Sequence, residues 1–184
     1  MEPVPDLRER NLGAIFDTIL DADGDSIITS ADFSRLAQGV CAQLGIQAGQ
    51  KAAAISQAYL SWWEQLSRTS GHDRDGQVTR AEFTGAHLTG QGNPQAYYEE
   101  QVSSLMRIIG DALDTDGDGF IEQAQYIQLF GLASLPAEAV AAGFARLDRD
   151  GDGRISIREW NAGATHAFLS GDPQDPGTAM LGLT

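Results

Sequence analysis

The sequence predicts an all-α fold: a compact single domain of four helix–loop–helix units in two pairs, with short β contacts between paired loops. Three observations indicate it. An acidic twelve-residue loop occurs four times in the 184-residue chain, beginning at residues 21, 71, 114 and 148. Apolar residues recur three and four positions apart beside these loops, which is the spacing of one buried helix face. The eighth loop position is always β-branched, and the residue after the twelfth is always aromatic, so the four copies share one register.

The first unit is predicted around the loop at 21–32 by an apolar stripe on each side. The stripe of the entering helix consists of Leu12, Ile15, Phe16, Ile19 and Leu20. The stripe of the exiting helix consists of Phe33, Leu36, Ala37, Val40, Cys41 and Leu44. Because Cys41 lies on the buried face, we expect an unreactive core thiol. A single cysteine also excludes an internal disulfide.

The second unit has the weakest loop. Gly45 and Gly49 break the chain before a helix whose buried stripe is Ile55, Ala58, Tyr59, Trp62, Trp63 and Leu66. The loop at 71–82 begins with Gly71, where the other loops have a carboxylate. We therefore expect this loop to bind no ion at physiological calcium and to act as the structural partner of the first.

The second half of the chain repeats the arrangement after a connection from Thr89 to Pro94, which is rich in glycine and proline. We expect an N-terminal pair at 1–92, a C-terminal pair at 93–170 and a tail at 171–184 that packs on the core. One helix is predicted to enter the third loop, and Pro136 to begin the next. The apolar stripes are Tyr98, Val102, Leu105, Met106, Ile109 and Leu113, then Tyr126, Leu129, Phe130 and Ala133, then Val140, Phe144 and Leu147, and finally Trp160, Ala164, Ala167 and Phe168. In the tail, Met180, Leu181 and Leu183 would fill the space between the pairs; the alternative is a disordered terminus.

The loop at 148–159 carries the clearest chemistry. It reads D-x-D-x-D-G-x5-E, with Asp148, Asp150 and Asp152 at alternate positions, Gly153 at the sixth and Glu159 at the twelfth. Together with one main-chain carbonyl, these side chains place about seven oxygens around a divalent cation. Ligands of oxygen alone select calcium over zinc or copper. The pattern resembles an EF-hand.

The other loops depart from that pattern in ways that predict weaker binding. In the first loop Ser26 replaces the sixth-position glycine, and a non-glycine residue at positive φ costs about 1–2 kcal/mol. Asp32 replaces the twelfth-position glutamate and is one methylene shorter, which weakens calcium binding and lets magnesium compete. In the third loop Gln125 offers one neutral oxygen, for which Glu122 would compensate. The expected order of affinity is fourth loop, then third and first, with the second empty.

Composition bounds the function. The formal charge is -14, and by position the four loops contain 15 of the 26 acidic residues, so most of the acidity is a supply of ligands. Nucleic acid and anionic membranes are therefore disfavoured as partners. The chain has no apolar run long enough to cross a membrane and no signal peptide, and Glu2 replaces the glycine that myristoylation requires. We expect a cytoplasmic monomer whose ligand is calcium and whose protein targets, if any, the sequence does not name.

The spacing of the loops indicates a narrower resemblance. The loop starts are 50, 43 and 34 residues apart, so the first two units are farther apart than in calmodulin-like proteins. Together with the degenerate second loop and the chain length, this spacing resembles the sarcoplasmic calcium-binding protein group, including its bacterial member calerythrin. The resemblance implies a calcium buffer or transport protein with hands one, three and four occupied. The ligands it implies are Asp21, Asp23, Asp25, the Ile27 carbonyl and Asp32; Asp114, Asp116, Asp118 and the Phe120 carbonyl, with Gln125 in the place of a carboxylate; and Asp148, Asp150, Asp152, the Arg154 carbonyl and Glu159.

Two other functions stay open. A calcium sensor would expose an apolar groove to a partner protein, although three methionines are few for an adaptable groove. An enzyme resembling the coelenterazine photoproteins would use His, Trp and Tyr around an apolar cavity, and would rely on His87 and His166 facing inward from exiting helices. The chain has no Ser/His/Asp or Cys/His set, phosphate-cradling loop or zinc-like cluster, so we expect no enzyme.

Overall fold

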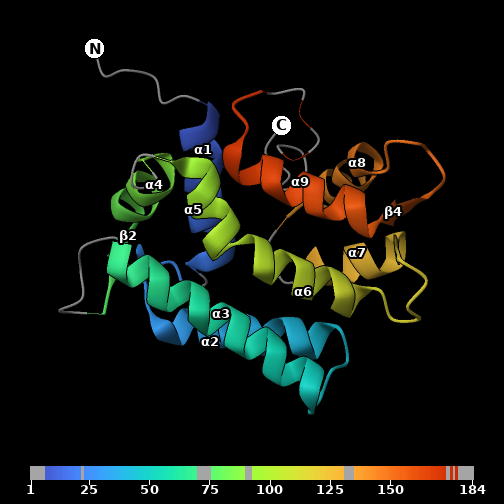
Figure 1. Cartoon of the computed structure of the whole chain (residues 1–184), viewed down its shortest axis with the longest axis horizontal. Coiled ribbons are helices and arrows are strands. Elements are labelled where there is room, and N and C mark those ends of the chain that lie inside the picture. Colours follow the sequence, from blue (N-terminus) through green and yellow to red (C-terminus); the bar gives the residue numbers. More distant parts are fainter. Residues whose placement is uncertain are drawn as a thin grey trace.

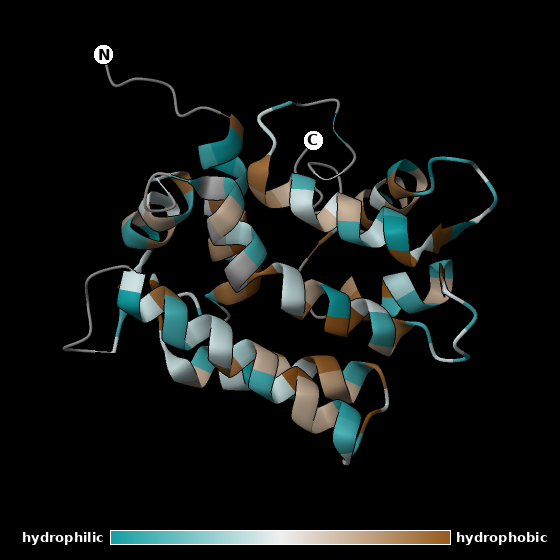
Figure 2. Ribbon diagram, in the orientation of Figure 1, coloured by the Kyte–Doolittle hydropathy of each residue, from teal (hydrophilic) through white to brown (hydrophobic). Residues whose placement is uncertain are grey.

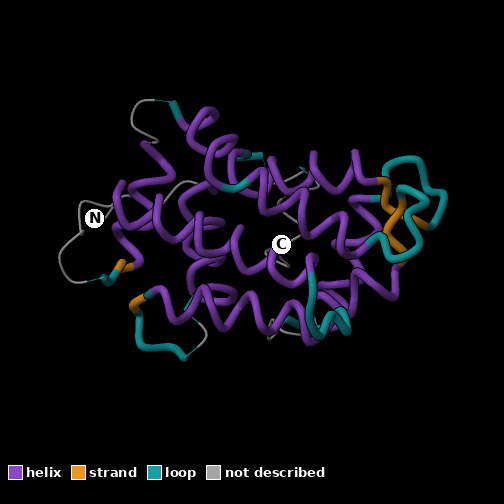
Figure 3. The backbone as a smooth tube through the Cα atoms, turned by 60° about the horizontal axis from the view of Figure 1, so that its bottom comes forward, coloured by secondary structure: helices purple, strands orange, loops and turns teal. Residues whose placement is uncertain are grey.

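The computed structural model describes residues 7–21, 23–69, 76–89, 93–130, 135–172, 175 and 177. Within these residues the chain is helical apart from two small pairs of strands, which confirms the predicted all-α class. Figure 3 shows the two pairs of strands at opposite ends of the molecule, with the helices between them. The loops that precede the strands therefore lie at the two ends as well.

The first unit contains α1 (Leu7–Ile15), a π-helix η1 (Phe16–Leu20), β1 (Ile27–Ile28) and α2 (Ser30–Gln43). The sequence predicts one continuous helix before the loop, but its last turn is wound as a π-helix, where the Asp21 amide donates to the Phe16 carbonyl at 2.9 Å. The wider turn carries Phe16 and Leu20 into the core. Thr29 begins α2 with a capping box that it forms with Asp32.

The second unit contains α3 (Gln50–Thr69), β2 (Val78–Thr79) and α4 (Arg80–Thr89). Strands β1 and β2 are antiparallel, with Ile28 opposite Val78. The weak second loop is thus joined to the first, as predicted for a structural partner. Its positions 71–75, including Gly71, lie outside the described residues.

The third unit corrects one prediction, because two helices enter its loop in place of one. Helix α5 (Pro94–Gln101) ends at Val102, and α6 (Ser103–Leu113) follows directly. Val102 has φ -110° and ψ -35°, while its amide still donates to the Tyr98 carbonyl at 2.9 Å. With this bend, α5 packs against α4 and α6 packs against α3. Figure 1 shows the change of direction between α5 and α6.

The rest of the third unit and the fourth unit contain β3 (Phe120–Glu122), α7 (Gln123–Phe130), α8 (Ala137–Leu147), β4 (Arg154–Ser156) and α9 (Ile157–Leu169). Strands β3 and β4 are antiparallel, with Ile121 opposite Ile155. Pro136 precedes the first residue of α8, which agrees with its predicted place at a helix start.

The two halves share one hydrophobic core. The Phe168 ring of α9 lies 6.1 Å from the Trp62 ring of α3 and 5.6 Å from the Tyr98 ring of α5, measured between centroids. The Arg8 side chain of α1 donates to the Phe168 carbonyl at 3.1 Å. Figure 2 shows hydrophobic and hydrophilic residues alternating along the helices, while the loops at the right edge are mainly hydrophilic.

Most predicted stripe residues are buried, and a few lie at the margin of the core. Among the described members, Ile19, Leu36, Leu44, Ala58, Met106 and Leu129 are only partly buried. Cys41 is buried, and burial raises the pKa of its thiol, in agreement with a core role. Trp62 and Trp63 are both buried as predicted.

The start of the C-terminal tail lies against α9. Asp175 contacts the His166 ring, with 2.6 Å between Oδ2 and Nδ1, and accepts the Gly177 amide at 3.0 Å. The predicted apolar plug, Met180 to Leu183, lies outside the described residues. In the part of the chain that is described, no helix has the length and apolar character needed to span a membrane.

Candidate metal centres

Three of the four loops bring three aspartates together. In each triad the carboxylate oxygens available for a metal lie within 4.8 Å of one another. The triads are the predicted ones, namely Asp21, Asp23 and Asp25; Asp114, Asp116 and Asp118; and Asp148, Asp150 and Asp152. Three converging carboxylates fit a hard divalent cation, because such an ion is held by oxygen ligands and offsets their mutual repulsion.

The first aspartate of each triad shapes its loop by accepting backbone N–H groups. In the fourth loop Asp148 Oδ1 accepts from Gly151 at 2.8 Å and Asp152 at 3.1 Å, and its Oδ2 accepts from Gly153 at 2.9 Å. The same three bonds recur at Asp114 in the third loop and at Asp21 in the first. The first carboxylate therefore fixes the backbone of each loop.

The sixth loop position has positive φ in all three loops, as predicted. The value is 87° at Gly153 and Gly119, and 66° at Ser26. Ser26 is the one non-glycine residue with positive φ among those the structure describes. Its side chain pays a steric cost of about 1–2 kcal/mol that the glycines avoid.

The twelfth position differs most between loops. Glu159 Oε2 accepts the Ser156 amide at 2.9 Å and hydroxyl at 2.7 Å, and its Oε1 accepts the Arg149 amide at 3.0 Å. Burial tends to raise the pKa of Glu159, but these hydrogen bonds from Ser156 and Arg149 outweigh it, and the pKa lies below its usual value. The group is thus held as a carboxylate facing the loop.

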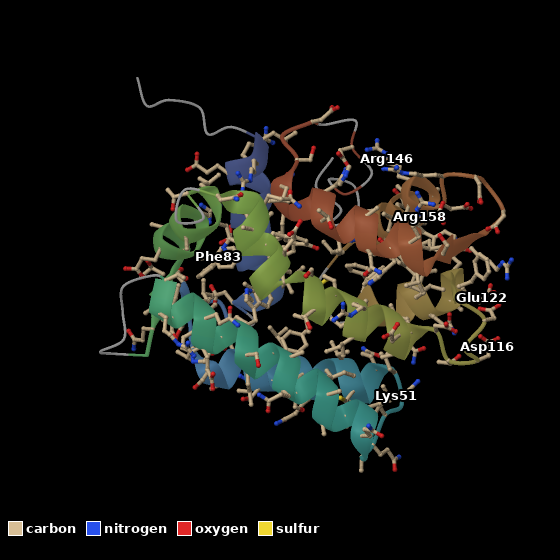
Figure 4. All side chains as sticks on the ribbon, in the orientation of Figure 1. Lys51, Phe83, Asp116, Glu122, Arg146 and Arg158 are labelled. Carbon is tan, nitrogen blue, oxygen red and sulfur yellow. The ribbon has the colours of Figure 1, made fainter. Side chains whose placement is uncertain are left out.

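Gln125 imitates this arrangement without the charge. Its Oε1 accepts the Glu122 amide at 2.7 Å, and its Nε2 donates to the Thr115 hydroxyl at 2.8 Å. Glu122, the proposed compensating ligand, is exposed at the rim of the loop near Asp116 (Figure 4).

The remaining predicted ligands are main-chain carbonyls at the seventh position. Ile27, Phe120 and Arg154 are the first residues of β1, β3 and β4. The short strands therefore fix these backbone positions relative to the paired loop. Their role as ligands stays a prediction.

Two arginines belong to these sites although the sequence analysis assigned no role to their side chains. The Arg154 side chain lies 3.3 Å from Asp118 Oδ2 and 3.6 Å from Asp152 Oδ2, and its guanidinium stacks 3.9 Å above the centre of the Phe120 ring. Arg154 thus bridges carboxylates of the third and fourth loops. Arg35 lies against Asp23 and Asp32 in the first loop; its spacing of three residues after Asp32 on one helix was the available signal.

A cavity of about 390 Å³ lies between the two halves. Its lining is largely apolar and aromatic and includes Tyr59, Trp62, Trp160 and Phe168, while Asp21 and Arg35 of the first unit also border it. The described residues that line it include no histidine. His87 is buried on α4 between the rings of Phe83 and Phe168, whereas His166 is partly exposed beside Asp175.

Comparisons with known proteins agree with this geometry. The family model described as EF hand matches residues 111–124 and 140–163, which contain the third loop up to its eleventh residue and the whole fourth loop. The probable calcium-binding protein CML21 of Oryza sativa subsp. japonica is 31% identical over 155 aligned positions; the match covers 78% of this chain and 73% of that protein. The chain belongs to the EF-hand family.

Further similarities support the narrower resemblance. Calerythrin of Saccharopolyspora erythraea is 26% identical over 148 aligned positions; the match covers 76% of this EF-hand chain and 80% of calerythrin. A calcium-binding protein of Streptomyces coelicolor has a solved structure with 27% identity and a TM-score of 0.74, covering 88% of this chain and 97% of that one. A sarcoplasmic calcium-binding protein from amphioxus has a TM-score of 0.77 over 99% of this chain and 100% of its own; at 15% identity this likeness shows the fold alone. The protein is therefore a calcium-binding EF-hand protein similar to calerythrin.

Proposed function

We propose that this EF-hand protein is a cytoplasmic calcium buffer or transport protein that holds three calcium ions, in its first, third and fourth loops. The observation that carries the proposal is the convergence of three aspartate triads, each within 4.8 Å. Glu159 completes the fourth site, which would be the tightest. Gln125 and Asp32 would complete the third and first sites less strongly, and Asp32, being short, would let magnesium compete at the first loop.

A buffer is favoured over a sensor because helix faces that a sensor would expose are used inside the molecule. Helix α3 contacts α6 across the two halves, and its Trp62 ring lies 6.1 Å from the Phe168 ring of α9. Among the described residues, the large hydrophobic side chains that are exposed are Leu60, at 36%, and Ile127, at 47%. Two separate side chains do not form a groove for a partner helix, and they also favour a monomer.

The second candidate is a calcium sensor, and the cavity of about 390 Å³ is the observation that favours it. If calcium widened this cavity, its aromatic lining would become a binding surface for a partner protein. A photoprotein-like enzyme has less support, because neither His87 nor His166 is among the residues that line the cavity.

Calorimetric titration with calcium, in the presence of magnesium at cellular concentration, tests the proposal. A buffer should bind about three ions and should show little binding of a dye for apolar surface in either state. A steep rise of dye fluorescence with calcium would favour the sensor instead. Fewer than three ions would refute the assignment of the loops, and single Asp→Asn changes at Asp23, Asp116 and Asp150 would identify which loop binds none.

A further inference from the structure

Arg35 lies across the first candidate site. Its Nη2 is 3.0 Å from Asp23 Oδ2 and 2.6 Å from Asp32 Oδ1, so one guanidinium nitrogen joins the third and twelfth loop positions. The Asp32 side chain is 3% exposed, and its other oxygen accepts the Thr29 amide and hydroxyl, both at 2.7 Å. Both oxygens of this shielded carboxylate are thus already used within the protein.

The first loop is the one site with such a cation at this register. Arg35 is the third residue after the twelfth loop position, and the equivalent residues of the other units are Gly85, Gln128 and Ala162. Gln128 donates its amide to the Gln43 carbonyl, outside its own loop. Within the described part of the chain Glu159 forms no ion pair, and Gln125 carries no charge, so the arrangement at Asp32 is not a general feature of these loops.

We propose that Arg35 is an intramolecular competitor of calcium at the first loop and a determinant of that site's affinity. The inference rests on the proposed function, because it takes the first loop as a calcium site. A divalent ion held by Asp23 and Asp32 takes the oxygens that Arg35 uses, and the two positive charges repel each other at such distances. Binding therefore requires the guanidinium to leave. Since the Arg35 side chain is 50% exposed, it can move into water without unfolding the helix.

The first site should therefore need a higher calcium concentration to become occupied than it would need if Arg35 were absent. The competitor also neutralises part of the loop in the absence of metal, which stabilises the metal-free protein. Arg35 thus acts in opposite directions on the two states: it should raise the stability of the metal-free form and lower the affinity for calcium. A side chain that served only to hold the helix would not produce this opposition.

The test measures both effects in Arg35→Gln, with Arg35→Lys as the variant that keeps the charge. Calcium is titrated in chelator-buffered solutions while amide resonances report each site, Ser26 for the first loop and Gly119 and Gly153 for the others. We expect Arg35→Gln to bind calcium about tenfold tighter at the first loop, with the other two sites unchanged. Its metal-free form should unfold at lower urea concentration than the parent. Arg35→Lys should lie between the two proteins in both measurements.

Arg68→Gln is the matched control, because it removes an arginine from an exposed pair with Glu64 within α3. It should leave the first site unchanged. An unchanged first-site affinity in Arg35→Gln would overturn the inference, and so would a tighter site without loss of metal-free stability. If the parent binds no ion at the first loop, the three-ion proposal fails separately; the Arg35 inference then stands only if Arg35→Gln gains that ion, and it falls if the variant also binds none.

Discussion

Exchanging the residues at 125 and 159 isolates the contribution of the twelfth ligand. Gln125 and Glu159 hold the same place in their loops, since each accepts the amide of the ninth loop residue, at 2.7 Å and 2.9 Å. The second atom of each head group contacts the second loop residue, Thr115 at 2.8 Å and Arg149 at 3.0 Å. Glu159→Gln therefore gives the fourth loop the twelfth residue of the third, and Gln125→Glu does the reverse, while the ninth residues Ser156 and Glu122 stay different.

The expected size of the effect follows from the charge. Two unit charges about 4 Å apart interact by about 1 kcal/mol in water, and a divalent ion doubles this to about 2 kcal/mol. Since about 1.4 kcal/mol corresponds to a factor of ten in Kd, removing the charge weakens binding by at least about 30-fold. The lower dielectric of a site partly shielded from water increases the factor. Glutamine retains the capping box with Ser156, so the fold should be preserved.

Chelator-buffered calcium titration, followed at the Gly119 and Gly153 amides, measures the two sites separately. Glu159→Gln should shift the Gly153 transition to higher calcium by at least about 30-fold, and Gln125→Glu should shift the Gly119 transition to lower calcium by a similar factor. The reasoning is refuted if Glu159→Gln leaves the Gly153 transition in place. In that case residue 159 would cap α9 without binding the ion.

Two further predictions concern the core. Burial lowers the pKa of His87 to about 4 from 6.5, so between these values the unfolded chain binds a proton that the folded chain does not, and stability should fall by about 3 kcal/mol as pH decreases through this window. Urea unfolding across that range should show the loss in the parent and in His166→Gln but not in His87→Leu; an equal loss in all three would contradict it. Gly110→Ala places a methyl group 2.7 Å from Trp160 Cδ1, whereas nothing lies within 4 Å of the same position in Gly85→Ala. Relative to the parent, Gly85→Ala should gain about 0.5–1 kcal/mol, and Gly110→Ala should be about 1–3 kcal/mol less stable than Gly85→Ala in urea unfolding; equal stability would show that α6 and α9 separate freely.

The local features of the sites could be predicted from the sequence because they depend on neighbouring residues. A carboxylate at alternate positions and a residue at positive φ are fixed within twelve residues, and the triads and Ser26 agree with the prediction. The pairing of loops was also predictable. A β-branched residue at the eighth position of each loop favours a short strand, and Ile28 and Val78 indeed lie opposite each other.

The bends in the helices could not be predicted from periodicity. Tyr98, Val102, Leu105 and Ile109 fit one continuous apolar stripe, yet the chain turns at Val102. Periodicity reports which face of a helix is apolar, but it does not report whether the surfaces on which that face packs lie along one line. The π-turn at Phe16–Leu20 has the same origin, since it depends on where the core lies relative to the first loop.

The sequence by itself determined that this protein has four helix–loop–helix units, that three of its loops carry aspartate triads, and that calcium is the fitting ion. Only the tertiary structure decided what surrounds those triads: Arg35 beside Asp23, Arg154 between the third and fourth loops, and a core that joins both halves through Phe168. The physical reason is the reach of each interaction. Ligand spacing and backbone conformation act within one loop, whereas long arginine side chains and aromatic rings act between segments that only the packed fold brings together.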